Sequence, residues 1–274
     1  MLATSKAAAK PKIVLLGHKD PAERIELDPE EGPAESEIAV AQDMWGEGNL
    51  SPLDNVFAST AIGALAVTGK AIFGAVCHHL GHRLFCFSRE IDIWLDAYEC
   101  EPALSLIQKR PKDKIKLGAW NANENKLGKD RYTKLAVLGM SKASVPLASL
   151  FDDCASSLKR KGNLFVADLV AGNGRAAPLA RYGDLESLAD HRSALSNAGF
   201  ALCNEVDLTA DVEGAIRRGF HNSLNALANI RALKEPWRSQ RLAAYCRQIE
   251  IMGNLYRDLE CGCVSAAGIL ALKP

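Results

Sequence analysis

The sequence predicts an α/β protein built on a doubly wound, mostly parallel β-sheet. The first observation is a short apolar run at residues 163–170, which is rich in Val, Leu and Phe. This run is too short for a helix and apolar enough for a strand that is buried on both faces. The second observation is that short apolar runs alternate with helical segments along the chain, which implies right-handed crossovers between parallel strands.

The remaining elements follow from the same patterns. A helix over residues 145–159 should end at the basic stretch 159–161, because cations favour a helix C-terminus, and Gly162 should close it in the left-handed conformation. Other strands are predicted at residues 71–76, 93–98, 115–120, 135–140, 200–208 and 264–272. Other helices are predicted from residue 36 and at residues 53–67, 83–89, 102–110, 185–198 and, with an interruption near Pro236, 211–259.

Three segments differ in composition. Residues 1–37 are rich in Ala, Lys, Pro and Glu and are predicted to be a mobile N-terminal arm. Residues 38–70 are predicted to form a helical lid or extension, and residues 71–274 the main domain. The long helical stretch at about 211–259 indicates a helical insertion before the last strand.

Charge and hydropathy exclude some classes of function. The chain has 33 basic and 33 acidic residues, so no overall field attracts nucleic acid or an anionic membrane. The apolar run at residues 13–16 is too short for a signal peptide, and no stretch approaches the ~18 apolar residues of a membrane span. The eight cysteines are scattered, which favours free, buried thiols. These features predict a cytoplasmic protein that binds neither nucleic acid nor membrane.

The strand-to-helix turn after the strand at 71–76 is the expected place for a nucleotide cofactor. Gly74 and Gly81 bound this turn, and bulky residues including Cys77 lie between them. Glu99 follows the next strand, 25 residues after Gly74, where a carboxylate can accept hydrogen bonds from both hydroxyls of a ribose. A solvated turn residue is the alternative interpretation of Glu99.

A set of short motifs occurs in order over residues 40–274 and resembles one family. The motifs are WGEGNLSP at 45–52, IWLDAYECEPAL at 93–104, LKRKGNLFVADLV at 158–170, AGF at 198–200, DLT at 207–209 and the terminal ILALKP. Together they resemble class I S-adenosylmethionine-dependent methyltransferases that act on small molecules. The resemblance implies a Rossmann-like sheet of seven strands with the last strand antiparallel, S-adenosylmethionine as cofactor and a small-molecule substrate.

The resemblance also assigns site residues by position. It implies a lid over the substrate at Trp45, Gly46, Glu47 and Gly48. It places Trp120 and Asn121 beside the adenine, and Gly139 and Met140 near the sulfonium. The cofactor contacts that it implies are Gly74, Cys77, Gly81, Glu99, Trp120, Asn121, Gly139 and Met140.

The cofactor turn departs from the family pattern. Residues 75–79 read Ala-Val-Cys-His-His where the family has an acidic residue and a Gly-x-Gly core. This departure supports a second hypothesis, in which the chain is a methyltransferase-like pseudoenzyme that serves as a binding or assembly subunit. Such a subunit is expected to work as a homodimer or with a protein partner.

Histidines and cysteines in and near this turn allow a competing interpretation. The turn and its surroundings contain Cys77, His78, His79, His82 and Cys86. His78 and His82 could share one helical face as zinc or iron ligands, but the spacing matches no standard zinc site. Capping or packed histidines are the favoured interpretation, so no metal is predicted.

The catalytic base cannot be chosen from the sequence; His79, His82 and His221 are the candidates. Cys261 and Cys263 flank one glycine before the last strand, and this spacing is typical either of a redox pair or of packed turn residues.

Overall fold

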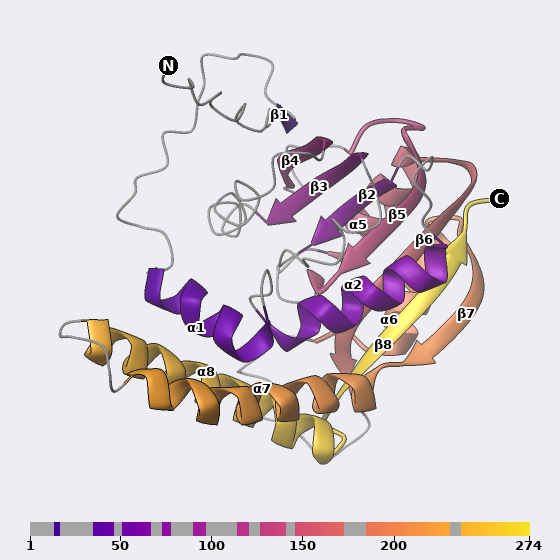
Figure 1. Ribbon diagram of the computed structural model, residues 1–274. Coiled ribbons are helices and arrows are strands. Elements are labelled where there is room, and N and C mark those ends of the chain that lie inside the picture. The colour runs from indigo at the N-terminus through magenta and orange to yellow at the C-terminus, as the bar shows by residue number, and fades with distance from the viewer. Residues whose placement is uncertain are drawn as a thin grey trace, which may run out of the picture.

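The structure, a computed structural model, is an α/β fold with one sheet between two layers of helices (Figure 1). It describes residues 14–16, 35–46, 51–66, 73–77, 90–96, 114–120, 127–140, 146–172, 185–230 and 237–274. Within these ranges the sheet has eight strands in the order β1-β4-β3-β2-β5-β6-β8-β7. The strands are β1 (Val14–Leu16), β2 (Phe73–Cys77), β3 (Glu90–Asp96), β4 (Lys114–Trp120), β5 (Tyr132–Leu138), β6 (Leu158–Ala171), β7 (Ala201–Asp207) and β8 (Val264–Leu272).

The strand pairing confirms the predicted fold class. Strands β1 to β6 pair in parallel, and β8 runs antiparallel to both of its neighbours, β6 and β7. Strand β2 lies between β3 and β5, in the middle of the parallel region, as the sequence predicted. The sheet has one strand more than the seven predicted, because the three-residue strand β1 pairs with β4 at one edge.

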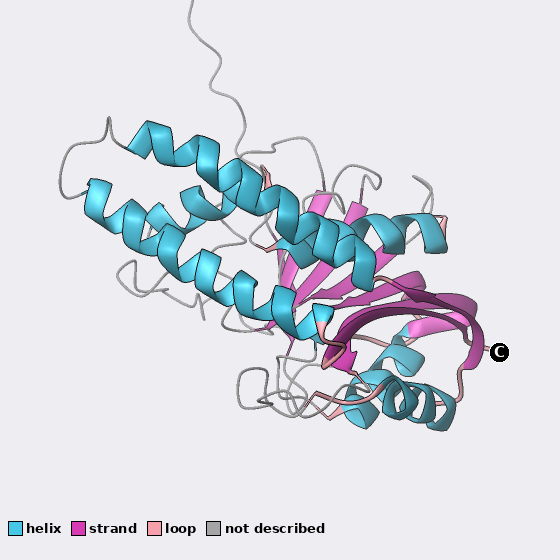
Figure 2. Cartoon of the chain, turned by 90° about the horizontal axis from the view of Figure 1, so that it is seen from below, coloured by secondary structure: helices cyan, strands magenta, loops and turns pink. Residues whose placement is uncertain are grey.

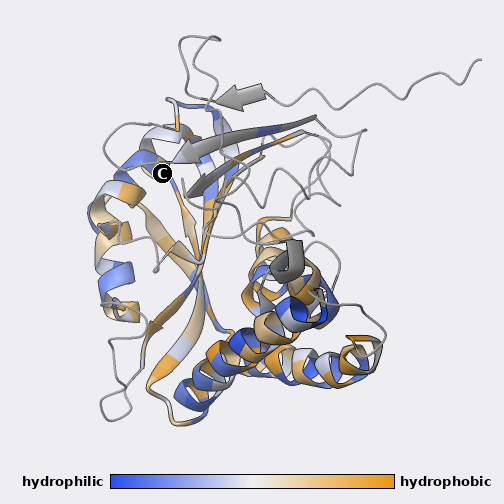
Figure 3. Cartoon of the chain, turned by 90° about the vertical axis from the view of Figure 1, so that its left-hand side faces the viewer, coloured by the Kyte–Doolittle hydropathy of each residue, from blue (hydrophilic) through white to orange (hydrophobic). Residues whose placement is uncertain are grey.

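Helices cover both faces of the sheet (Figures 2 and 3). One face packs against α1 (Glu35–Trp45), α2 (Pro52–Leu65), α7 (Thr209–Ile230) and α8 (Trp237–Glu260), and the other against α5 (Leu147–Ser157) and α6 (Leu188–Asn197). The apolar cores on the two faces follow the alternation of side chains along the strands. In β2, for example, Ala75 and Cys77 belong to the first core and Val76 to the second.

Two helices begin with a reciprocal capping box. At α2, Ser51 donates its backbone N–H to Asp54 Oδ2 at 3.0 Å and its hydroxyl to Asp54 Oδ1 at 2.9 Å. At α6, the Ser187 N–H donates to Asp190 Oδ2 at 2.9 Å, and the Asp190 N–H donates back to Ser187 Oγ at 3.2 Å. The boxes satisfy backbone groups that the first helical turn leaves without partners.

The predicted helix end at residues 159–161 is wrong. Helix α5 ends at Ser157, and Leu158 already belongs to β6. Leu158 pairs with Tyr132, and the residues between it and Asn163 form an irregularity in the ladder. Within this irregularity Lys161, and not Gly162, has a positive φ, at 63°. Gly162 is needed for space, because a Cβ there would lie 2.8 Å from the carbonyl oxygen of Lys159. Strand β6 is also parallel on one side only, since β8 flanks it antiparallel.

A buried polar network ties β3 to the start of β5. Asp92 is only 4% exposed, and its Oδ2 lies 2.5 Å from Arg131 Nη2. The Tyr132 hydroxyl donates to Asp92 Oδ2 at 3.2 Å and accepts from Trp94 Nε1 at 2.9 Å. Burial raises the pKa of Tyr132, so the hydroxyl stays protonated and can serve both partners. Because Tyr132 opens β5, the network lies toward the amino ends of the parallel strands.

Replacing Tyr132 by Phe should destabilise the protein by about 1–3 kcal/mol, because the indole N–H of Trp94 loses its acceptor and Asp92 loses a donor. Urea unfolding followed by circular dichroism measures the change. Tyr256→Phe is the matched control, since no hydrogen bond of its hydroxyl is found among the described residues and its stability should change little. Equal destabilisation by both substitutions would contradict a role for the Tyr132 hydroxyl.

Candidate functional site

The strand order reverses between β2 and β5, and ligands of doubly wound sheets bind beyond the carboxyl ends of the strands at such a point. The described residues at this edge are the last residues of β2, β3, β4 and β5, together with Gly139 and Met140. Four of the residues that the resemblance assigns to the cofactor lie at this edge: Cys77, Trp120, Gly139 and Met140.

Gly74 lies inside β2 and not in the turn that was predicted to cradle the cofactor. A Cβ at Gly74 would lie 2.8 Å from Tyr132 Cε1 and 2.9 Å from Leu135 Cδ1, so the glycine makes room for the neighbouring strand. Cys77 ends β2 and is fully buried on the face covered by α1, α2, α7 and α8. Burial, with a smaller contribution from Asp54, raises the pKa of Cys77, so its thiol is an uncharged packing group.

Trp120 and Met140 both lie in the apolar core on the face covered by α5 and α6. Each is 2% exposed, and both belong to one core cluster with Val76 and Trp94. The indole N–H of Trp120 has no hydrogen-bond partner among the described residues. Gly139 has φ 67° and donates its N–H to Ala167 O at 2.8 Å, which turns the chain sharply after β5.

The predicted lid is only partly described. Trp45 ends α1, is 8% exposed, and packs its ring onto Gly219 of α7. Gly46 follows with φ 92° and donates its N–H to Gln42 O at 2.9 Å, which ends the helix. These two residues therefore anchor α1 to α7.

The other predicted site residues divide into two groups. His221 is exposed on α7. The rest lie outside the described residues, and these are Glu47, Gly48, His78, His79, Gly81, His82, Cys86, Glu99 and Asn121.

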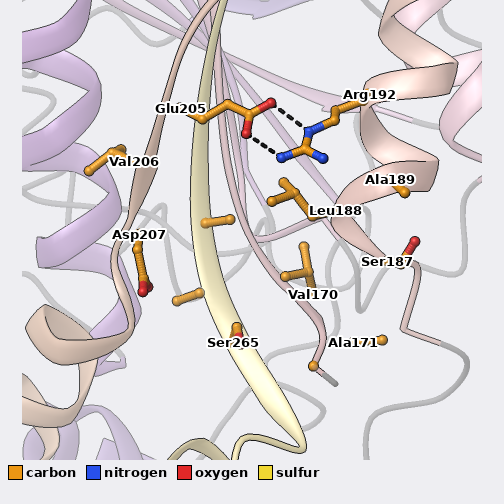
Figure 4. Close-up of a pocket in the computed structure, with 13 residues that line it drawn as sticks. Val170, Ala171, Ser187, Leu188, Ala189, Arg192, Glu205, Val206, Asp207 and Ser265 are labelled. Atoms are coloured by element: carbon orange, nitrogen blue, oxygen red, sulfur yellow. Dashed lines mark hydrogen bonds and ion pairs between the residues drawn. The ribbon is translucent and has the colours of Figure 1, made fainter. Parts of the chain in front are cut away.

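A cavity of about 590 Å³ lies farther along the same edge of the sheet, beside α6 (Figure 4). The last residues of β6 and β7 and the first residues of β8 line it, because β8 runs antiparallel to both. Apolar side chains, including Val170 and Leu188, form part of its wall.

An ion pair closes one side of this cavity. Arg192 on α6 binds Glu205 on β7 through two parallel contacts, from Nε to Oε1 at 2.6 Å and from Nη2 to Oε2 at 2.5 Å (Figure 4). The hydrogen bond with Arg192 lowers the pKa of Glu205, so the pair remains charged near neutral pH. The pKa of Asp207 is also lowered, by hydrogen bonds from Thr209. The lining is therefore mixed, with apolar walls and charged groups at the end of β7.

Sequence reasoning missed this cavity. Ser187 and Asp190 have the spacing of a capping box and could have marked the start of α6. The partnership of Arg192 with Glu205 has no local signal, because it depends on how α6 packs against β7.

The part of the chain that the structure describes contains no helix long and apolar enough to cross a membrane. It also contains no cluster of three or more His, Cys, Asp or Glu residues arranged for a metal.

Comparisons with known proteins support the fold assignment. No family profile matches the chain, and no curated protein matches its sequence. Among solved structures, phosphoethanolamine N-methyltransferase 2 of Haemonchus contortus, in complex with phosphomonomethylethanolamine and S-adenosylhomocysteine, aligns with a TM-score of 0.73 and 12% identity over 86% of this chain. This chain spans only 57% of the length of that protein.

Two further solved structures are similar over most of the chain. A Galdieria sulphuraria protein, assigned as a sarcosine dimethylglycine methyltransferase, gives a TM-score of 0.64 at 13% identity and covers 87% of this chain and 98% of its own. Geranyl diphosphate C-methyltransferase from Streptomyces coelicolor A3(2) gives 0.60 at 14% identity, with 79% and 75% covered. At these identities the likeness shows the fold, which is that of class I S-adenosylmethionine-dependent methyltransferases.

The contact between Trp45 and Gly219 yields a stability prediction. A Cβ at Gly219 would overlap the Trp45 ring, so Gly219→Ala should cost about 1–3 kcal/mol in unfolding free energy. Gly253→Ala, on α8, is the matched control, because no atom lies within 4 Å of its added Cβ and Ala should stabilise that helix by about 0.5–1 kcal/mol. Chemical denaturation of both variants measures the difference. If Gly219→Ala and Gly253→Ala both raised the unfolding free energy, α1 would not pack on α7 in this way.

Proposed function

We propose that this chain transfers a methyl group from S-adenosylmethionine to a small molecule. The observation that carries the proposal is the strand order β4-β3-β2-β5-β6-β8-β7 with β8 reversed, together with the likeness over most of the chain to three methyltransferases. Two of those structures hold S-adenosylhomocysteine, the product that remains after methyl transfer. Since one fold hosts many functions, the proposal also needs support from residues of this chain.

Described residues at the carboxyl ends of the parallel strands support the proposal. Trp120 supplies a buried indole N–H that has no protein partner among the described residues and can donate to an acceptor atom of the cofactor. Gly139 has no side chain and turns sharply, which lets a ligand approach the backbone after β5. Met140 contributes an apolar side chain to the same core cluster as Trp120. Glu99 remains the predicted partner of the ribose hydroxyls.

The chemistry needs little more than positioning. When bound, S-adenosylmethionine supplies an electrophilic methyl group on a sulfonium. The chain contributes by holding a nucleophilic atom of the substrate in line with that methyl and by excluding water. A base is needed only if the nucleophile loses a proton, and His79, His82 and His221 stay the candidates.

We also propose a cytoplasmic location and a homodimer, with a small-molecule substrate or a protein partner. Two features support self-association: all seven residues of the edge strand β7 are exposed, and Leu242 and Ile249 on α8 are 46% and 37% exposed. Sedimentation equilibrium should give twice the 29.5 kDa mass of one chain. A single 29.5 kDa species at high micromolar concentration would contradict the proposed homodimer.

Cofactor binding is the first test of the proposed activity. At a concentration ~100 times its dissociation constant, S-adenosylmethionine or S-adenosylhomocysteine should add about 2.7 kcal/mol to the unfolding free energy. Thermal-shift titration and calorimetry on the full chain measure this stabilisation. Glu99→Gln should weaken binding, because a neutral amide accepts hydrogen bonds from the ribose less strongly than a carboxylate.

The matched control is Glu260→Gln, an exposed glutamate at the end of α8, which should bind the cofactor like the unmodified chain. Absence of any stabilisation by millimolar cofactor would overturn the enzymatic proposal and favour the binding or assembly subunit. Binding that Glu99→Gln leaves unchanged would place the ribose elsewhere.

A further inference from the structure

Two cysteine sulfurs lie close together in the turn between α8 and β8. The Sγ atoms of Cys261 and Cys263 are 2.9 Å apart, and both residues are reduced thiols. A disulfide bond is about 2.05 Å long, so the sulfurs would need to approach by less than about 1 Å to bond.

The backbone of the helix cap explains this proximity. The N–H of Gly262 donates to Leu259 O and the N–H of Cys263 donates to Asp258 O, each at 2.9 Å, and Gly262 has φ 70°. These bonds are those of a Schellman motif, in which a left-handed residue folds the chain back after the last helical turn. Cys261 and Cys263 flank that residue, so the cap itself brings their side chains together.

Reagents can reach this pair. Cys261 is exposed and Cys263 is partly exposed, whereas Cys77 and Cys154 are fully buried. The pKa of Cys263 is raised, chiefly by its hydrogen bond with Cys261. Cys261 is the more exposed of the two thiols, so a disulfide reagent in solution reaches it first.

We propose that Cys261 and Cys263 form a reversible intramolecular disulfide by exchange with a low-molecular-weight disulfide. The Cys261 thiolate attacks one sulfur of that disulfide, forms a mixed disulfide and releases one thiolate. The sulfur of Cys263 then attacks Cys261, forms the internal bond and expels the second thiolate, which takes up the proton that Cys263 loses. The two protein thiols are oxidised, and one small disulfide is reduced to two thiols.

The site borders the cavity beside α6. Gly172 donates its N–H to Cys263 O at 2.9 Å, and a Cβ at Gly172 would overlap the Gly262 carbonyl. Gly172 and Ser265 both line the cavity. The disulfide would thus form directly behind one wall of the cavity.

Titration with mixtures of reduced and oxidised glutathione tests the proposal on the full chain. The intact mass before alkylation should fall by about 2 Da, because disulfide formation removes two hydrogens. Alkylation should then modify two fewer thiols, and reduced glutathione should reverse both changes. Peptide mapping of the unmodified sequence should locate the bond between Cys261 and Cys263, and this result does not depend on any variant.

Variants separate this pair from Cys203 and Cys246, the exposed cysteines elsewhere among the described residues. Cys263→Ser should stop at a mixed disulfide with glutathione on Cys261, because no neighbouring thiol resolves it. Cys203→Ser and Cys246→Ser each remove one exposed cysteine outside the pair and should still form the internal bond. The proposal is overturned if the unmodified chain gives only glutathione adducts, or if Cys263→Ser still shows the loss of two thiols.

Discussion

The packing at the centre of the sheet depends on glycine at position 74, which has no side chain. The Tyr132 ring fills the space where a Cβ would project, and this position lets its hydroxyl bridge Trp94 and Asp92. The same core cluster continues to Trp120, at the carboxyl end of β4. One glycine in β2 thus supports the packing beneath the candidate cofactor edge, which accounts for a glycine at this position without any contact to a ligand.

Strand β6 divides the sheet into two chemically different halves. On one side the parallel strands β2 to β5 end at the reversal of strand order, where a nucleotide cofactor is expected. On the other side β8 runs antiparallel, so its start lies beside the ends of β6 and β7 and helps to form a separate cavity. The pairing direction of one strand therefore helps to form the cavity beside α6.

The sequence predicted the strands well, because a short apolar run between polar or glycine-containing segments is long enough for a buried strand and too short for a helix. Strand β8, Val264–Leu272, agrees with the predicted range. It failed at Lys161 and Gly162, where a basic run followed by glycine resembles a helix end but is an irregularity in β6. The candidate site was less predictable, since glycines at strand ends suggest ligand contact and packing equally. The pairing of Arg192 with Glu205 depends on tertiary packing, which no local pattern encodes.

The N-terminal helical extension and the late helical insertion were predicted as separate additions, yet their described parts form one packed layer. The Tyr245 hydroxyl donates to Asp43 Oδ2 at 2.7 Å, and Asn222 Nδ2 donates to Met44 O at 3.0 Å. Together with Trp45 on Gly219, these contacts fasten the end of α1 to α7 and α8. Movement of α1 alone would break both hydrogen bonds and expose an indole, so any opening of the N-terminal segment requires the three helices to move together.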